Sequence, residues 1–430
     1  MADFLDDLIG MSKEFDKLKN ELSDMGSSIL GEEPERLVWN PSDYKEYPKV
    51  NPERCVRSIF EGASCTRCLD ICPTDSISFE DGYPEILKDC RRCGLCVQTC
   101  PNNALYITKY SPDALYRKVS QVAGVQHTAY VTCTRALGHV PEAAQIVLPC
   151  VGLISAEVWS AIKLDYPNIA IYLPIGICDK CKTITGEEAY VNEVSLAEVW
   201  TDSTMDLVVS EDEMVLETRR DVERKNFIGN AAKSVGLSAA KVNPLTARLA
   251  RTYEKLEAHQ LKFNEINKTI DRLVGVKTNE KKRYLTPERQ LVLTTIKSHY
   301  ELAERMHVLI PDIKDASLYD EEEILEVVDA CPTGALDYED EKISIEALYC
   351  TGCDLCADMM PGLFTMQEMN AEKAFYRLTP EAKKEREEEL ERKRQREEER
   401  ASHIQQVKDF AKRAGDISEK IADDIESKKH

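Results

Sequence analysis

The chain has 430 residues, enough for about three domains of ordinary size. Its formal net charge of −21 argues against nucleic acid as a partner, because a phosphate backbone binds a basic surface. The sequence contains no signal peptide and no apolar run that approaches the roughly 20 residues needed to span a bilayer, so we expect a cytoplasmic protein without direct membrane insertion. In that setting its 16 cysteines favour metal binding or redox chemistry over disulfides.

Residues 1–31 predict an amphipathic helix. Apolar residues recur there at alternating spacings of three and four, with acidic and basic residues between them. Such a helix packs on its own domain, or it forms a coiled-coil arm that meets a partner or the C-terminal tail. The pattern does not separate these two hypotheses.

Residues 32–111 carry two cysteine runs. CRRCGLCVQTCP, at residues 90–101, has the spacing Cys-x2-Cys-x2-Cys-x3-Cys-Pro, in which three thiolates hold one [4Fe–4S] cube and the fourth ligates a neighbouring cube. The upstream run GASCTRCLDICP has the same pattern, but Gly62 stands at its first position. Cys55 can return to the vacant corner through a short loop; otherwise the first site holds a [3Fe–4S] centre. Between the runs, SISFEDGYPEI predicts a β-hairpin around Asp81-Gly82.

These runs predict two clusters with crossed ligation. The first is assigned to Cys55, Cys65, Cys68 and Cys100. The second is assigned to Cys72, Cys90, Cys93 and Cys96. Residues 50–111 resemble a bacterial two-cluster ferredoxin of the [4Fe–4S] type, and the resemblance implies one-electron transfer. A zinc site or buried thiols is the alternative for the same cysteines.

Residues 112–212 predict a small parallel α/β domain. HTAYVTC, AAQIVLPC and NIAIYLPI are short apolar, β-rich runs, and SAEVWSAIKL predicts a helix capped by Ser155. Because strand ends of a parallel sheet converge on one edge, we expect a tetrathiolate site there, formed by Cys133, Cys150, Cys178 and Cys181. LPCVGLISAEV and GICDKC, within residues 125–185, resemble the δ-subunit domain of hydrogenases that work with heterodisulfide reductases. That resemblance implies a [2Fe–2S] cluster; zinc and buried free thiols are the alternatives.

Residues 213–305 are expected to be mostly helical, and residues 306–377 return to the cysteine-rich pattern. CTGCDLCADMMP, at residues 350–361, matches the two-cluster spacing except that Met360 replaces the fourth cysteine. Upstream, ACPTGALDYEDEKISIEALYC repeats the form of ICPTDSISFEDGYPEILKDC, so Cys331 corresponds to Cys72. The third cluster is therefore assigned to Cys331, Cys350, Cys353 and Cys356, with zinc as the alternative.

The loss of the paired site explains Met360. The stretch before Cys331 contains no cysteine, so the cluster that a fourth cysteine would have served is absent. Met360 is then expected to fill packing space.

Residues 378–430 form the tail. The run 381–400 is almost wholly charged and predicts an exposed helix or a disordered linker, with Glu388 and Arg392 as a favourable i,i+4 pair. A last amphipathic stripe follows it, and we expect the tail to act in complex assembly.

Together these features predict an α+β multidomain chain with two ferredoxin-like iron–sulfur modules, a small α/β domain between them, a helical linker and coiled-coil-like terminal helices. We expect three [4Fe–4S] clusters and one [2Fe–2S] cluster or zinc ion. The function expected is that of an iron–sulfur electron-transfer subunit of a cytoplasmic oxidoreductase complex, not itself the enzyme, with redox partners of flavin, hydrogenase or reductase type. The alternative is a redox- or metal-sensing adaptor.

Overall fold

The computed structural model describes residues 38–218, 283–375, 388, 391–392 and 394–396. By its contacts the chain divides into two compact units, Met1–Asn370 and Ala371–His430. The expectations for the helix at 1–31, for the helices between 219 and 282 and for the amphipathic stripe beyond 397 lie outside the described residues.

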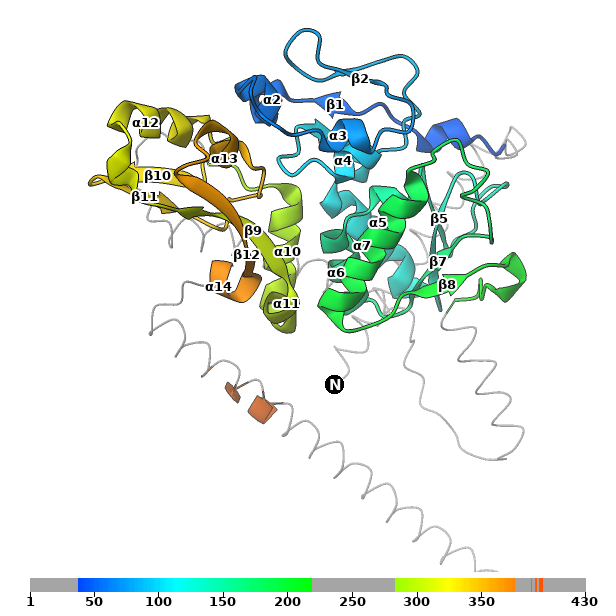
Figure 1. Cartoon of the computed structure of the whole chain (residues 1–430). Helices are drawn as coiled ribbons and strands as arrows, with labels where there is room; N and C mark the ends of the chain where they lie inside the picture. Colours follow the sequence, from blue (N-terminus) through cyan, green and yellow to red (C-terminus); the bar gives the residue numbers. More distant parts are fainter. Residues whose placement is uncertain (1–37, 219–282, 376–387, 389–390, 393, 397–430) are drawn as a thin grey trace, which may run out of the picture. The chain divides into compact units, whose positions relative to one another are not determined.

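Short elements surround the first two cysteine runs (Figure 1). They are η1 (Pro41–Tyr44), β1 (Lys49–Val50), η2 (Pro52–Arg54), α2 (Val56–Ile59), α3 (Arg67–Asp70), β2 (Ile77–Ser78), β3 (Glu85–Ile86), α4 (Leu95–Gln98), β4 (Leu105–Tyr106) and η3 (Thr108–Tyr110). The predicted hairpin is confirmed, since β2 pairs antiparallel with β3. Gly82 has a φ of +78°, a conformation that glycine adopts without strain. A second antiparallel pair, β1 with β4, brings the two ends of this region together.

The predicted parallel α/β unit is confirmed. Its four-stranded sheet has the order β6-β5-β7-β8, and every neighbouring pair is parallel. The strands are β5 (Ala129–Cys133), β6 (Gln145–Leu148), β7 (Ile169–Tyr172) and β8 (Asp206–Val208). The first three are buried along their whole length, which explains their continuous apolar runs.

Helices α5 (Pro112–Val125), α6 (Ala156–Asp165) and α7 (Gly186–Thr201) accompany this sheet, with the 3₁₀ turns η4 (Val151–Leu153) and η5 (Glu211–Glu213) (Figure 1). Ser155 stands at the N-cap of α6, as expected, but its side chain makes no capping hydrogen bond. Instead Ala156 N donates to Oε2 of Glu193 on α7, at 2.7 Å. Ser155 therefore holds the predicted position, but the predicted hydrogen bond from its hydroxyl group is wrong. The carboxyl group of Glu193, on a neighbouring helix, accepts from the helix N-terminus instead.

The second described range, from residue 283, begins with two helices, α10 (Pro287–Ser298) and α11 (Glu301–Arg305). Thr286 caps α10, since its hydroxyl accepts from Arg289 N at 3.3 Å. α10 packs against α5 and α6, and α11 packs against α7. His299, at the end of α10, contacts Asp165 at the end of α6, with 3.0 Å between Nε2 and Oδ1. These helices therefore belong with the helical layer of the α/β unit.

The last cysteine region is built on two antiparallel pairs. Its elements are β9 (His307–Ile313), η6 (Ala316–Leu318), α12 (Glu321–Ala330), β10 (Leu336–Glu339), β11 (Lys342–Ile345), α13 (Leu355–Met359) and β12 (Phe364–Asn370). β9 pairs with β12, and β10 pairs with β11. The two expected extended arms are thus confirmed, and the turn between them has positive φ at both Asp340 (52°) and Glu341 (59°). Two consecutive residues with positive φ are typical of a type I′ hairpin turn.

The second unit, described by itself, begins with α14 (Ala371–Phe375). Its described residues between 388 and 396 are helical and exposed, and Arg392 Nε donates to the backbone oxygen of Glu388 at 3.1 Å. Among the residues that the structure describes, no helix is both long and apolar enough to cross a membrane.

Candidate functional site

The sixteen cysteines are all free thiols, and they gather around four separate cavities. The first cavity is lined by Cys55, Cys65, Cys68 and Cys100. The second is lined by Cys72, Cys90, Cys93 and Cys96. The third is lined by Cys331, Cys350, Cys353 and Cys356. The fourth, the α/β site, is lined by Cys133, Cys150, Cys178 and Cys181.

Each quartet is thus the one that the spacing predicts, and Cys72 and Cys100 have crossed to opposite cavities as expected. Cys55 lines the first cavity, as expected if a short loop returns it to the vacant corner. The turn is made by η2 and α2, which lie on either side of Cys55. Which of these thiols ligate iron stays a prediction.

Three Cys-Pro turns share one geometry. The backbone N–H four residues after each cysteine donates to its sulfur: Ser76 to Cys72 at 3.3 Å, Ala104 to Cys100 at 3.2 Å, and Ala335 to Cys331 at 3.2 Å. The residue three after each cysteine has positive φ: Asp75 (48°), Asn103 (53°) and Gly334 (64°). Such N–H···S bonds stabilise charge on the sulfur, and hydrogen bonds of this kind tune cluster potentials.

The Cys-x2-Cys-x2-Cys loops match in the same way. In the second site Arg92 (55°) and Gly94 (85°) have positive φ, and in the third site Gly352 (64°) and Asp354 (67°) occupy the corresponding positions. A short helix follows in both, α4 and α13, each beginning after its left-handed residue. The backbone therefore repeats where the sequence does, so each loop presents its three sulfurs to one cavity.

Met360 stands at the position that corresponds to the fourth cysteine of the first module, and it lies in an apolar core. It is 8% exposed and packs with Ile324, Val327 and Phe364. Two of these partners come from α12, the helix that stands in place of the missing cysteine run. The prediction that Met360 serves packing is confirmed. The apolar face of α12 packs where the missing site would need its cysteines.

The α/β site follows from the sheet topology. Cys133 is the last residue of β5, Cys150 follows β6, and Cys178 and Cys181 lie on the loop after β7. Since all three strands are parallel, their carboxyl ends meet at one edge. Thr183 N donates to Cys181 Sγ at 3.4 Å, so this loop also presents a backbone N–H to sulfur.

Burial and mutual repulsion raise the pKa of several cysteine thiols, among them Cys68 and Cys353. Burial, followed by the charges of Cys100, Cys65 and Cys55, raises the pKa of Cys68 to about 12. Burial raises the pKa of Cys353 to about 12, and Cys331 and Cys350 add to the shift. Four such groups become thiolates together only when a cation neutralises them, so metal loading must release protons. Among the described residues, no three His, Cys, Asp or Glu side chains are close enough to hold a single metal ion.

The third site lies beside the first. Cys65 and Cys353 pack on the same apolar cluster of Val56, Ala63 and Leu355. Polar bonds connect the same two regions: Arg67 Nη2 donates to the backbone oxygen of Gly352 at 3.1 Å and to Asp354 Oδ2 at 3.0 Å, and Thr351 Oγ1 donates to Asn102 Oδ1 at 2.6 Å. The residues that these bonds join are between 249 and 287 positions apart in the sequence, and no sequence motif predicts their contact.

The second site lies beside the α/β site. Cys93 and Cys150 share an apolar cluster with Leu95 and Ala189, and Thr185 Oγ1 donates to the backbone oxygen of Ile71 at 2.7 Å. The charges of Cys68 and Cys96 also interact across the first and second sites. The contacts therefore connect the sites in the order third, first, second, α/β, which differs from their order in the sequence.

Known proteins are similar to short parts of this chain. The 4Fe-4S binding domain matches residues 85–106. An uncharacterized ferredoxin of Methanocaldococcus jannaschii is 44% identical over 41 residues, which are 9% of this chain and 27% of that protein, so the chain spans about a quarter of its length. A second uncharacterized ferredoxin of the same organism is 31% identical over 52 residues, 12% of this chain and 84% of that protein. No solved structure matches. Because this chain covers most of the length of the second ferredoxin at 31% identity, it belongs to the ferredoxin family, and it carries a 4Fe-4S binding domain.

Proposed function

We propose that this protein is an iron–sulfur electron-transfer subunit of a cytoplasmic oxidoreductase complex, with three [4Fe–4S] clusters and a fourth iron–sulfur centre at the α/β site. One observation carries the proposal: every cysteine of the chain belongs to one of four quartets, and each quartet lines its own cavity. Clusters, when bound, supply one-electron transfer.

The residues present fit such groups. Each cavity offers four sulfurs, and backbone N–H groups already point at Cys72, Cys100, Cys331 and Cys181. At the α/β site we favour a [2Fe–2S] cluster over zinc, because LPCVGLISAEV and GICDKC resemble the hydrogenase δ-subunit domain, a resemblance that implies such a cluster.

We further propose that the four sites form one unbranched relay, ordered third, first, second and α/β. The support is the pairwise contact of neighbours: the apolar cluster that Cys65 shares with Cys353, and the one that Cys93 shares with Cys150. The third and α/β sites then form the two ends, each exchanging electrons with a different partner subunit of flavin, hydrogenase or reductase type. The substrate chemistry belongs to those partners.

Anaerobic iron and acid-labile sulfide analysis tests the cofactor content. We expect about twelve iron atoms from three cubanes and about fourteen if the α/β site holds a [2Fe–2S] cluster. A preparation dominated by zinc, with no labile sulfide, would overturn the proposal.

Electron paramagnetic resonance of the fully reduced protein tests the order. Loss of the third site through Cys353→Ser should remove magnetic coupling from the first site and leave the coupling between the second and α/β sites intact. Loss of the α/β site through Cys178→Ser should do the reverse. Coupling between the third and α/β sites that survives loss of the first would contradict the linear order.

A further inference from the structure

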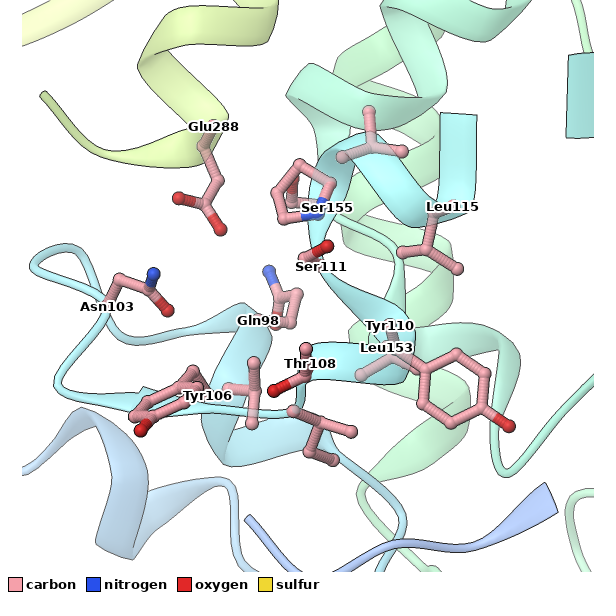
Figure 2. Close-up of a pocket in the computed structure, with 14 residues that line it drawn as sticks. Gln98, Asn103, Tyr106, Thr108, Tyr110, Ser111, Leu115, Leu153, Ser155 and Glu288 are labelled. Atoms are coloured by element: carbon pink, nitrogen blue, oxygen red, sulfur yellow. The ribbon is translucent and has the colours of Figure 1, made fainter. Parts of the chain in front are cut away.

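A cavity of about 250 Å³ lies next to α4, the helix that carries Cys96, and no cysteine lines it. Figure 2 shows that its walls come from the segment around Tyr106, from the starts of α5 and α6, and from the start of α10. Ser111 and Ser155 are the N-cap residues of α5 and α6, and Glu288 is the second residue of α10. Three helix N-termini therefore meet at one space.

Ser155 brings an unused hydrogen-bonding group to this cavity. Its residue is 6% exposed, and its hydroxyl has no hydrogen-bond partner in the structure. The capping role that would have satisfied it is taken by Glu193, which accepts from Ala156 N. A buried hydroxyl without a partner costs free energy, so a ligand atom that bonds to it gains that free energy back.

The charges around the cavity select against ions. Glu288 is the only charged residue among those that line it, and Figure 2 shows its carboxyl group directed into the open space toward Gln98. Burial, with the charge of Glu157, raises the pKa of Glu288 to about 7. An anion would meet the Glu288 carboxyl group, and no basic side chain lines the cavity to pair with it. A cation would meet the positive ends of three helices.

Apolar side chains form much of the remaining wall, beside the polar side chains of Asn103, Thr108 and Ser111. Leu115, Leu153 and Val158 face the cavity together with Val97 and Ile107. A dry cavity of about 150 Å³ holds a benzene ring in another protein, so this volume accommodates a ring with substituents.

We propose that this cavity binds a small neutral ring compound that carries a hydroxyl group. The ring lies among Leu115, Leu153 and Val158, and the hydroxyl bonds to Ser155 Oγ and the Glu288 carboxyl group. Nothing in this binding depends on the number of clusters or on their order.

Calorimetric titration of the anaerobically purified full-length protein with phenol tests the proposal. We expect saturable binding at one site, weakened about fivefold or more by Ser155→Ala and by Glu288→Ala, because each removes one hydrogen bond. Ser160→Ala is the matched control: Ser160 lies on the same helix and has an equally buried, unpaired hydroxyl, but it does not line the cavity. It should leave the affinity unchanged.

Charged analogues and a filling variant complete the test. Benzoate and benzylammonium should bind at least about tenfold more weakly than phenol, because benzoate buries a carboxylate without a basic partner and benzylammonium meets the positive ends of three helices. Val158→Phe should abolish binding, and Val199→Phe, at an exposed position of α7, should not. No saturable binding at millimolar phenol, or equal effects of Ser155→Ala and Ser160→Ala, would overturn the proposal. The iron–sulfur absorption of each sample shows separately whether the variant is folded and loaded.

Discussion

Cys331 and Met360 are the two residues at which the assignment of the third site can be tested. Cys331 lines the cavity and accepts a hydrogen bond from Ala335 N, whereas Met360 packs against α12. We therefore expect Cys331→Ser to lower the iron content by up to about four atoms and to remove one paramagnetic signal. Met360→Leu, a swap of similar volume, should keep both. The assignment is wrong if the signal survives the first change and disappears with the second.

Glu193 should make stability depend on pH. Burial, with a contribution from Glu157, raises the pKa of its carboxyl group from 4.5 to about 7, while Ala156 N–H and Gln98 oppose the shift. The folded state therefore favours the neutral carboxyl, so this contribution to stability is complete below pH 4.5 and is lost as the pH rises through about 7.

Glu193→Gln keeps an oxygen for Ala156 N–H and removes the titration. We expect the variant to lose less thermal stability than wild type between about pH 5 and about pH 8, by a few degrees in the unfolding temperature measured under argon. Glu188→Gln, at an exposed position of the same helix, serves as the control. Identical pH profiles for Glu193→Gln and wild type would show that Glu193 does not titrate in this range.

At the scale of elements, Gly94 connects a metal-binding loop to the α/β domain. Its φ is +85°, and a Cβ built there would meet Leu153 Cδ1 on η4. Gly82, in the hairpin turn, has a similar φ of +78° but open space around it. Gly94→Ala should therefore lower the unfolding temperature more than Gly82→Ala. Both substitutions strain the backbone, but only the alanine at position 94 also clashes with a neighbouring side chain. Equal effects in thermal unfolding would mean that Leu153 moves aside freely.

Local chemistry explains which elements the sequence predicts correctly. The hairpin at Gly82, the buried parallel strands and the two arms before Cys350 each depend on a short pattern of turn residues or on the burial of a few neighbours. The hydrogen bond at the start of α6 could not be predicted, because Glu193 accepts it from a different helix. The residues next to Ser155 carry no signal for that contact. Strand β8 was missed because its exposed Leu207 leaves little apolar pattern.

For the molecule as a whole, cysteine spacing predicts which thiols gather but not how the sites follow one another. Each quartet comes from two or three segments of the chain, and the loops of the second and third sites repeat their backbone conformations. The contact between the third and first sites includes the bond of Arg67 to Asp354, and the contact between the second and α/β sites includes the bond of Thr185 to Ile71. These long-range contacts have no periodic signal in the sequence, so the order in which the sites touch becomes visible only in the fold.

The tail supplies the last prediction at this scale. Residues 381–430 follow all four cysteine quartets, and their described part, between 388 and 396, is helical and exposed. A helix of twenty residues spans about 30 Å, which is enough to carry the amphipathic stripe that follows to another subunit. An amphipathic helix is marginal alone in water, so that stripe needs a surface that buries it. We expect deletion of residues 381–430 to leave iron and sulfide content unchanged and to weaken co-purification of the partner subunits severalfold. Loss of iron from the shortened chain would place the tail within the cluster-bearing fold, and undiminished co-purification would show that it is not a docking arm.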